Sequence, residues 1–468
     1  MTVIAWLRRS LREFDNTSVI RASEESETVI PFYCVDDDYF RETELGYPRV
    51  KFWRESLEEL KESLEDKGKD LVIRKGKPVE QLKKIVKETD AEKVVVNQDY
   101  IPYFRELLEK LREELEVPVE TVKDVVMFEK EEITTNKGTP YKVYTYFMKK
   151  WFKRDKRKPE EPEDYTVPDL KSDDIPSLEE LGFEEPEDFE WKWNPGREGG
   201  LERLESFKDD IAFYNEKRDS PAVDGTSRIS PHLKFGTVSI REAFWEMEEF
   251  KEEEPGAEDG VKTWQEELAW RDFYFQVLWN WPETVDTAFL EDFRELDWKT
   301  DKELFKKWKK GKTGYPFIDA GMRQLKRTGW MHNRARMAVT SFAAKDLWLD
   351  WRMVHEYFKR TYVDAELSSM IGGIQWAYSI GTDAQPYFRI FNPWTQGEDH
   401  DPDGEYIREF VPELEEVPDR YIHRPYKMPE EVQEEAKCII GKDYPEPMVE
   451  HDEAREKALK RFKEAKGK

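Results

Sequence analysis

The chain reads GWMHNRARM at residues 329–337, GGIQW at 372–376 and GTDAQPYFRIFNP at 381–393. Few soluble proteins place so many tryptophan, arginine, aspartate and glycine residues in one block. This block lies in a half of the chain where helical patterns recur and strand patterns nearly vanish. Helices are expected at 201–214, 238–250, 263–279, 301–310, 317–328, 333–348 and 351–362. From residue 201 onward we therefore predict an all-α domain.

The first 130 residues show a different pattern. Short apolar runs rich in β-branched residues occur at 3–7, 29–35, 70–73 and 93–97, and helical patterns separate them at 49–67, 78–89 and 103–115. Alternating strands and helices predict an α/β domain with a doubly wound parallel sheet. The region lacks Gly-x-Gly-x-x-Gly, so this fold alone does not imply a dinucleotide there.

Two further segments complete the predicted organisation. Residues 153–200 are rich in Pro, Glu and Asp and poorly periodic, which indicates a long connector, partly helical at 177–181, that packs against both domains. The charged, helix-prone end of the chain is expected to be an appendage exposed to solvent. The predicted divisions are an α/β domain at 1–130, a connector at 131–200, a helical domain at 201–430 and a charged extension at 431–468.

The chain is strongly acidic. Its 468 residues include 76 Lys and Arg against 103 Asp and Glu, which gives a net charge of −27. This balance argues against nonspecific nucleic-acid binding by the whole surface, although a local basic patch remains compatible with it. Adaptation to high intracellular salt and simple solubility both explain the acidity, and we favour the first.

Cysteine and histidine counts exclude several classes of site. Cys34 and Cys438 are the two cysteines, too few for a disulfide framework, a zinc cluster or a four-cysteine iron–sulfur site, and the six histidines form no metal-binding pattern. No apolar run approaches the ~20 residues of a membrane span, and the chain starts directly as a strand without a signal peptide. We expect a cytoplasmic monomer without a metal or a membrane contact.

Two motifs carry chemistry. The run TSRISP at 226–231 combines hydroxyls with Arg228 just ahead of a helix, as an anion site does. On local grounds an ordinary cap is favoured, with Ser230 at the N-cap and Pro231 as the first helical residue. The second motif, WQEELAWRDFY at 264–274, places three aromatic rings, Glu267 and Arg271 on one helical face. Such a face is usually a core stripe with a buried salt bridge. The alternative is a cavity in which a flat apolar molecule stacks on Trp270 while Glu267 hydrogen-bonds its polar edge.

With the flanking Tyr214, Arg218-Asp219 and Asp224-Gly225 and the opening WLRRSLR at 6–12, these motifs resemble the photolyase/cryptochrome flavoproteins over nearly the whole chain. The resemblance implies a buried flavin adenine dinucleotide (FAD) and shifts the balance at 226–231 towards the pyrophosphate site. By resemblance, the pyrophosphate contacts are Tyr214, Thr226, Ser227, Arg228 and Ser230. The other FAD contacts are Ile229, Trp264, Glu267, Arg271, Trp330, Asn333, Arg336, Asp364, Glu366 and Met370, with Arg336 paired to Asp364. His332 is expected to be a core histidine.

The resemblance is closest to the branch that repairs cyclobutane pyrimidine dimers, a carbon–carbon lyase activity. It implies catalytic roles for Glu267, Trp270, Asn333 and Met337, whereas the branch acting on (6-4) photoproducts would place His at position 333. Photolyases flip their target out of the duplex, and the partner would be UV-damaged DNA, held by Arg218, Arg334 and Arg389. Asp399 stands where relatives are often basic. Repair would proceed by electron transfer from photoexcited reduced FAD. A cryptochrome-like blue-light receptor on the same scaffold is the alternative, and a redox flavoprotein that merely binds nucleotide is a third.

Two features depart from the family pattern. Members usually reduce FAD through three tryptophans that run to the surface; Trp351 and Trp308 match the outer two, but Ile374 aligns with the innermost. Trp376 is expected to substitute for it. The second departure is Met370, where photolyases usually carry Asn. Tyr103-Phe104 replaces the Asn-Glu of folate users, so a light-harvesting antenna, if there is one, is expected to be deazaflavin.

Overall fold

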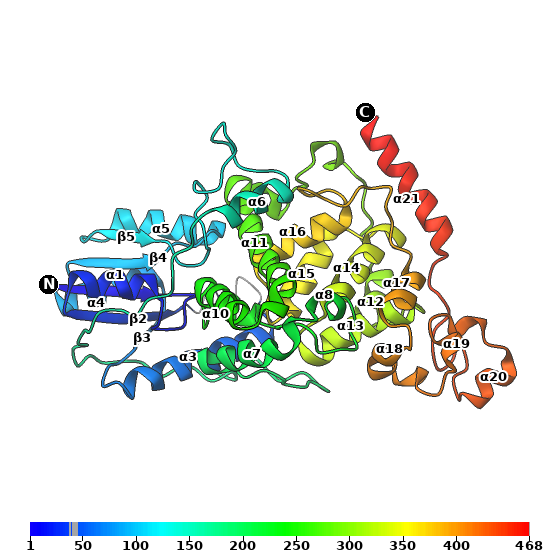
Figure 1. Cartoon of the computed structure of the whole chain (residues 1–468), viewed down its shortest axis with the longest axis horizontal. Coiled ribbons are helices and arrows are strands. Elements are labelled where there is room, and N and C mark those ends of the chain that lie inside the picture. Colours follow the sequence, from blue (N-terminus) through cyan, green and yellow to red (C-terminus); the bar gives the residue numbers. More distant parts are fainter. Residues whose placement is uncertain (37–38, 40–44, 468) are drawn as a thin grey trace.

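The computed structural model describes residues 1–36, 39 and 45–467. It shows an α/β part that holds the N-terminus and a larger helical part that holds the C-terminus (Figure 1). Five parallel strands form the sheet in the order β3-β2-β1-β4-β5. Their bounds are β1 Thr2–Leu7, β2 Thr28–Val35, β3 Val72–Lys75, β4 Lys93–Asn97 and β5 Val119–Val122. The predicted fold class is confirmed, and β5, a short edge strand without a long apolar run, is an addition to the four predicted strands.

Helices cover both faces of this sheet. They are α1 (Thr17–Glu25), α3 (Tyr47–Glu65), α4 (Pro78–Thr89) and α5 (Pro102–Glu114). Side chains alternate along β1: Val3, Ala5 and Leu7 join one apolar cluster with α1 and α3, while Ile4 and Trp6 join the opposite one with α4 and α5. Burial on both faces explains why these strands read as continuous apolar runs.

The connector packs against both parts, as predicted. Its backbone donates from the Asp173 N–H to the Ile73 carbonyl (2.9 Å) and from the Glu190 N–H to the Arg327 carbonyl (2.7 Å). The helix expected at 177–181 is wrong: the segment forms only a turn, closed by Leu181 N–H to the Ser177 carbonyl (3.2 Å). Gly182 follows at φ +80°, a left-handed conformation that ends the turn.

The helical part confirms the predicted all-α half. Its long helices are α7 (Gly196–Ile211), α10 (Ile240–Glu253), α11 (Glu258–Asn280), α13 (Pro316–Thr328), α15 (Trp351–Thr361), α16 (Leu367–Tyr378) and α21 (His451–Lys466). Shorter ones are α6 (Tyr144–Lys153), α8 (Tyr214–Lys217), α9 (Ser230–Phe235), α12 (Lys302–Lys309), α14 (Asn333–Ser341), α17 (Pro393–His400), α18 (Glu405–Phe410), α19 (Asp419–Ile422) and α20 (Glu430–Glu435). The single helix predicted at 333–348 is α14 followed by one π-helical turn, η4 (Phe342–Asp346). No helix in the described ranges is both long and apolar enough to cross a bilayer, and no three or more His, Cys, Asp or Glu side chains there are arranged to hold a metal.

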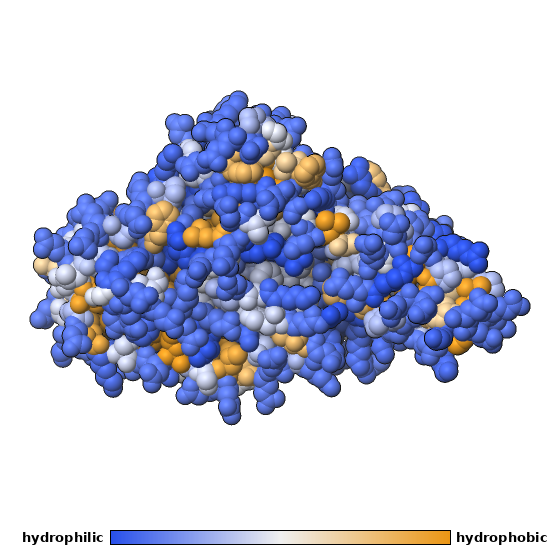
Figure 2. Space-filling model, turned by 60° about the horizontal axis from the view of Figure 1, so that its bottom comes forward, coloured by the Kyte–Doolittle hydropathy of each residue, from blue (hydrophilic) through white to orange (hydrophobic). Residues whose placement is uncertain are grey.

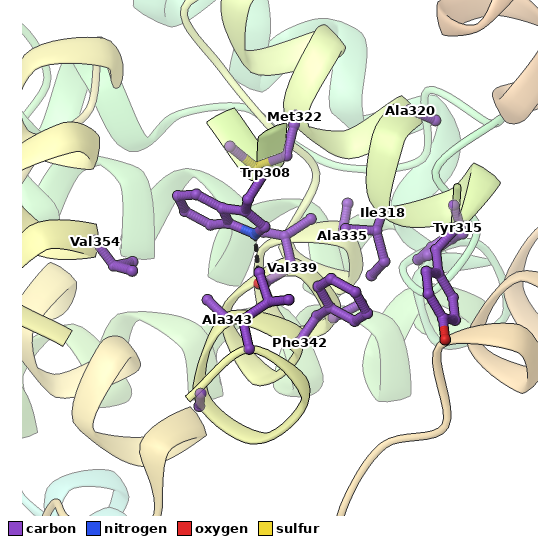
Figure 3. Close-up of a cluster of buried hydrophobic side chains, with 14 of the residues drawn as sticks. Trp308, Tyr315, Ile318, Ala320, Met322, Ala335, Val339, Phe342, Ala343 and Val354 are labelled. Carbon is purple, nitrogen blue, oxygen red and sulfur yellow. Dashed lines mark hydrogen bonds between the residues drawn. The ribbon is translucent and has the colours of Figure 1, made fainter. Parts of the chain in front are cut away.

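The main core lies between α12, α13, α14 and α15 (Figure 3). Trp308 is fully buried in it and donates its indole N–H to the Val339 carbonyl (3.1 Å). Sequence reasoning expected this tryptophan at the surface end of a relay. The aromatic rings of Phe305, Tyr357 and Phe358 instead pack around it and exclude solvent.

The C-terminal helix α21 is docked against the body and is no appendage, which corrects the sequence-based expectation. Phe462 is fully buried against Trp298 and Trp348. His451 Nδ1 lies 2.6 Å from the Asp346 carboxylate, in a pair that is also buried. Phe462, an aromatic residue in an otherwise charged segment, is the sequence feature from which this contact could have been predicted. Elsewhere the visible face is mainly hydrophilic, with small scattered apolar patches (Figure 2).

Candidate functional site

The loop before α9 is a cluster of free backbone donors. The N–H groups of Thr226, Ser227, Arg228 and Ile229 donate to no acceptor within the described protein. The carbonyls of Thr226 and Ser227 are held by the Arg203 guanidinium at 3.0 and 3.2 Å. Arg228 has φ +47°, which is uncommon for a residue other than glycine. Successive free N–H groups at such a turn form a concave site for an anion.

Side chains complete this loop. The Arg228 guanidinium lies 3.0 Å from the Asp224 carboxylate and 4.8 Å from the centre of the Trp330 ring. Trp264 donates its indole N–H to Ser227 Oγ at 3.0 Å. Tyr214 and Ile229 are buried beside them. The residues that sequence reasoning assigned to the pyrophosphate are therefore close together, and Arg203, which no motif marked, organises them.

Ser230 does not cap the helix, so the ordinary-cap interpretation is wrong. It is the first residue of α9 rather than its N-cap, and its hydroxyl donates to Asp364 Oδ2 at 2.6 Å. Arg336 binds the same carboxylate through one nitrogen, at 2.8 and 3.1 Å. The Asp364 side chain is only 3% exposed. The predicted Arg336–Asp364 pair thus forms and joins α9 to α14.

Glu366 and Arg271 belong to a charged cluster at the boundary with the α/β part. Arg9 donates to the Glu366 carboxylate, and the charged ends of Lys234 and Arg271 lie 3.9 and 4.0 Å from it. Burial alone would raise the pKa of Glu366, but Arg9 and Lys234 outweigh burial and lower that pKa below its usual range. Arg271 also donates to the carbonyls of Val125 and Leu233 at 2.6 and 3.2 Å.

Trp270 of α11 has one face covered. The Tyr144 ring stacks on it with centroids 3.6 Å apart and planes 9° apart. Tyr144 is fixed by its N–H, which donates to Asp383 Oδ2 (2.9 Å), and by its hydroxyl, which donates to the Glu266 carbonyl (2.7 Å). Sequence reasoning missed Tyr144 because its partner is distant in the chain. The aromatic at the start of a helical pattern, at residues 144, 147 and 151, was the available signal.

Asp272 anchors α6 to α11 below this stack. Its carboxylate accepts the Trp151 indole N–H at 2.9 Å and the Met127 and Phe128 backbone N–H groups at 3.0 and 3.2 Å. Burial raises the pKa of Asp272 to about 6, although these bonds act in the opposite direction. Desolvation of the charged form therefore outweighs three donors.

Glu267 and Arg218 form an ion pair at 2.6 Å at the mouth of the site. The Glu267 side chain is 39% exposed. Burial nevertheless raises the pKa of this carboxyl, and Arg218 counters only part of the effect. Arg334 pairs with Asp219 at 2.7 Å, whereas Arg389 is exposed and has no acidic partner within the described ranges. Two of the three predicted DNA-binding arginines are thus already neutralised.

The start of α14 carries the remaining predicted substrate residues. Asn333 is exposed, and its amide lies 3.6 Å from Met337 Sδ. His332 is buried and accepts the Arg334 N–H on Nδ1 at 3.1 Å, so it caps the helix. Burial lowers the pKa of His332 to about 3, and this histidine is the core residue that was expected.

The two candidate relay positions, Ile374 and Trp376, lie on different sides of α16. Ile374 is buried in the core cluster that holds Trp351 and Trp308. Trp376 is half-buried outside that cluster, with its ring 6.5 Å from that of Phe391. Two residues on a helix differ by about 200° in direction. Trp376 therefore faces away from the core side on which Ile374 lies.

A cleft opens at the carboxyl ends of β1, β2 and β4. This edge of a doubly wound sheet, where the strand order reverses, is the usual place for a ligand. Arg8, Arg9, Arg49 and Lys234 line the cleft together with Tyr103, whose hydroxyl donates to Asp36 Oδ2 at 2.5 Å. Burial lowers the pKa of Lys234 to about 7.

Comparison with known proteins places this geometry in context. Residues 3–164 match the DNA photolyase family, and residues 264–464 match the FAD-binding domain of DNA photolyase. The deoxyribodipyrimidine photo-lyase of Halobacterium salinarum is 38% identical, over 99% of each chain.

Solved structures with a similar fold include two photolyases and a cryptochrome. A bacterial class III photolyase from Agrobacterium tumefaciens has a TM-score of 0.91 at 35% identity, covering 100% of this chain and 98% of its own. A Synechocystis cryptochrome has a TM-score of 0.90 at 27% identity, covering 98% of both chains. An archaeal photolyase from Sulfolobus tokodaii, solved with two FAD molecules, has a TM-score of 0.83 at 31% identity, covering 99% and 100%.

Proposed function

Because the chain belongs to the DNA photolyase family, we propose that it repairs cyclobutane pyrimidine dimers in UV-damaged DNA by light-driven electron transfer from reduced FAD. The observation that carries the proposal is the Trp270–Tyr144 stack beside Glu267. Tyr144 covers one face of the indole, and the other is proposed to stack on the two joined pyrimidines of the lesion, with a carboxyl next to it. Stacking of a base on an aromatic ring contributes about 1–3 kcal/mol.

The donor set at 226–230 fits the pyrophosphate of FAD. Four free N–H groups, the Thr226 and Ser227 hydroxyls and the nearby Arg228 guanidinium can donate to a ligand there, which suits two negatively charged phosphates. When bound and reduced, FAD supplies the light-excited electron donor. The chain binds and orients that group, with Arg336 held by Asp364 on the remaining side of the site.

Glu267 is proposed to hydrogen-bond the base edge of the dimer and stabilise the charge that develops there. Burial raises the pKa of this carboxyl. Arg218 holds the carboxyl at 2.6 Å and keeps it at the mouth of the site. Asn333 and Met337, adjacent on one face of α14, are proposed to contact the dimer from the opposite side.

DNA binding is proposed to involve all three arginines. Arg389 is free to meet a phosphate, whereas Arg218 and Arg334 would exchange or share their carboxylates. Each phosphate contact lowers the slope of log affinity against log salt by about 0.9. Binding through these phosphate contacts is therefore expected to weaken as the salt concentration rises.

The α/β cleft is the proposed antenna site. Its lining combines aromatic rings with Arg8, Arg9 and Arg49, which suits a ring system that carries an anionic side chain. Tyr103 lines it, in keeping with the deazaflavin expected from the sequence, and the Sulfolobus relative with two FAD molecules makes FAD the other candidate. Extraction of the purified protein and chromatography of the released chromophores distinguishes the two.

A light sensor is the second candidate. The Synechocystis cryptochrome shares the fold at a TM-score of 0.90, and Met370 departs from the Asn usual in photolyases. A sensor needs no dimer pocket, whereas a repair enzyme does. Trp270, Glu267, Asn333 and Met337 favour repair.

Repair by pre-reduced protein under blue light is the deciding experiment. Wild type should restore an oligonucleotide that contains one dimer. Glu267→Gln should retain FAD and repair with a lower quantum yield, because a neutral amide replaces the carboxyl and stabilises the developing charge at the base edge less well. Loss of FAD in this variant would make its lower yield uninformative, so absorbance of bound FAD is the control. Repair by the Gln variant with undiminished yield would contradict the role of Glu267.

A further inference from the structure

The loop that leads into α9 is held from behind by an arginine of α7. Arg203 donates through Nε to the Ser227 carbonyl at 3.2 Å and through a terminal nitrogen to the Thr226 carbonyl at 3.0 Å. One planar guanidinium therefore fixes two consecutive peptide groups, which a rigid fork of donors can do and a single ammonium group cannot. Arg203 is not among the residues that the family resemblance assigns to FAD.

The direction of these two carbonyls determines the direction of two N–H groups. The peptide bonds of the loop are trans, and in a trans peptide the carbonyl and the N–H of the next residue point in opposite directions. Because Arg203 holds the Thr226 and Ser227 carbonyls on its own side, the Ser227 and Arg228 N–H groups point to the other side. These are two of the four N–H groups that donate to no acceptor in the described part of the chain. Arg203 therefore lies behind the loop, away from a ligand that those groups bind.

The backbone of this loop has a conformation that needs support. Arg228 has φ +47°, in the left-handed region that residues other than glycine rarely adopt. A residue persists in such a conformation only where the contacts around it determine its backbone. The two bonds from Arg203 fix the peptide groups that precede Arg228, and the Trp264 indole N–H holds Ser227 Oγ at 3.0 Å.

Helix α7 is a firm base for Arg203 because it packs closely against α9. A β-carbon on Gly200 would clash with the Val238 side chain and lie 2.9 Å from His232 Nδ1, so glycine is needed at this close approach. Leu204 and Phe207, also on α7, are buried in an apolar cluster that is shared with α9. The guanidinium is therefore presented from a helix whose position relative to the loop is fixed.

Attraction between charges would be a simpler role for Arg203. Its guanidinium lies 3.7 Å from the Asp224 carboxylate, which also pairs with Arg228 at 3.0 Å. One carboxylate thus offsets part of the charge of both arginines. The Asp224 side chain is exposed, so water screens these charges further. The geometry of its two hydrogen bonds is therefore the main contribution of Arg203.

We propose that Arg203 is a positioning residue for the pyrophosphate of FAD, which acts by orienting the Ser227 and Arg228 N–H groups before the ligand binds. This role deepens the proposed function: it rests on FAD binding at this loop and not on dimer repair. Donors that are oriented in advance bind a ligand more tightly, because less conformational freedom is lost on binding. A different positive charge at this position should therefore not replace the arginine.

The test measures how fast FAD leaves the purified flavoprotein. Flavin fluorescence follows the release, and phosphorus NMR of bound FAD reports the surroundings of its two phosphates. Arg203→Met keeps an apolar stem and removes both donors, whereas Arg203→Lys keeps the charge without the fork. Arg197→Met is the matched control, because it removes an arginine of the same helix that donates to Glu242 instead. Far-UV circular dichroism shows whether each variant is folded.

Arg203→Met and Arg203→Lys should both release FAD about tenfold faster than wild type, the effect of misdirecting one hydrogen bond to a charged group. Both should also shift the phosphorus resonances, and Arg197→Met should do neither. If Arg203→Met does not fold, Arg203→Lys decides alone.

Release from Arg203→Lys at the wild-type rate would show that charge suffices and would overturn the proposal. Equal release rates and phosphorus spectra for Arg203→Met and Arg197→Met would overturn it as well. Failure of wild type to repair dimers would instead refute the repair function, and the role of Arg203 would still be decided by the release of FAD.

Discussion

Removal of the Asp364 carboxylate offers a sharp test of how the site is built. In Asp364→Ala the Arg336 guanidinium loses both of its bonds to that carboxylate, at 2.8 and 3.1 Å, and the Ser230 hydroxyl loses its acceptor. Breaking a buried pair from one side costs about 3–5 kcal/mol, because the remaining charge is left without a partner. Against a total stability of about 5–15 kcal/mol, this is a large share.

The control removes both charges. Asp364→Leu/Arg336→Met should cost less than Asp364→Ala alone, since well-packed apolar side chains often replace a buried pair at little or no cost. Thermal unfolding of FAD-free protein gives the comparison. At about 2–4 °C per kcal/mol for a unit of roughly 200 residues, the single variant should melt about 6–20 °C lower. FAD retention should fall in both variants, because both lose Arg336 or its orientation.

A single variant that melts within about 2 °C of wild type would refute the reasoning, since it would mean that water reaches Arg336 and replaces the carboxylate. The double variant would also refute it if its loss of stability equalled the sum of the losses in Asp364→Leu and Arg336→Met. The effects of independent side chains on stability add, whereas those of coupled side chains do not.

Three further outcomes follow from the same structure. Tyr144→Leu should raise the KM for dimer DNA because Trp270 loses the ring that fixes its plane, whereas Tyr144→Phe should stay near wild type; equal KM values would show that the stack is dispensable. Asp272 has a pKa of about 6 in the fold, above its usual value near 4, so the folded state holds a proton there that the unfolded chain has released. Its contribution to stability is therefore present at low pH and lost as pH rises through 6, by up to about 3 kcal/mol. The free energy of unfolding of wild type and of Asp272→Asn is compared at about pH 4.5 and about pH 7.5. Wild type should lose stability relative to the Asn variant at the higher pH; a difference that does not change with pH would contradict the shift. Finally, Ile374→Trp should accelerate light-driven reduction of bound FAD in the presence of a thiol, and Trp376→Phe, under the sequence-based rerouting hypothesis, should slow what remains; bleaching of the oxidised flavin band follows both, and no response to either variant would place the electron route elsewhere.

The α/β sheet could be predicted because its signals are local. Continuous β-branched runs alternate with amphipathic helices, and each strand is buried on both faces. Strand β5 shows the limit of that approach. This edge strand, Val119–Val122, is only partly buried and carries no long apolar run. The docked α21 shows a second limit, since one buried Phe462 decides the position of a helix that is otherwise charged.

The chemistry of the site was predictable where it follows a motif and obscure where it depends on tertiary contacts. The Arg336–Asp364 pair was expected from the family resemblance, whereas Arg203, Tyr144 and the use of Ser230 were not. Each of those three contacts a residue that is distant in the chain, and local propensity does not predict such a contact. Ser230 precedes a proline, which favoured a cap on local grounds, yet its hydroxyl donates to Asp364, a residue that is distant in the chain.

The tryptophan relay shows how burial changes the meaning of an aligned residue. Trp351 and Trp308 align with the outer tryptophans of the family's relay, but both are buried, and Trp308 is enclosed by Phe305, Tyr357 and Phe358. Ile374 lies on the core side of α16, and Trp376 points about 200° away from it. An electron that left through Trp376 would therefore start on the side of α16 away from the core that holds Trp351 and Trp308. Repair by reduced protein uses no such path, so the proposed activity is independent of how the flavin becomes reduced.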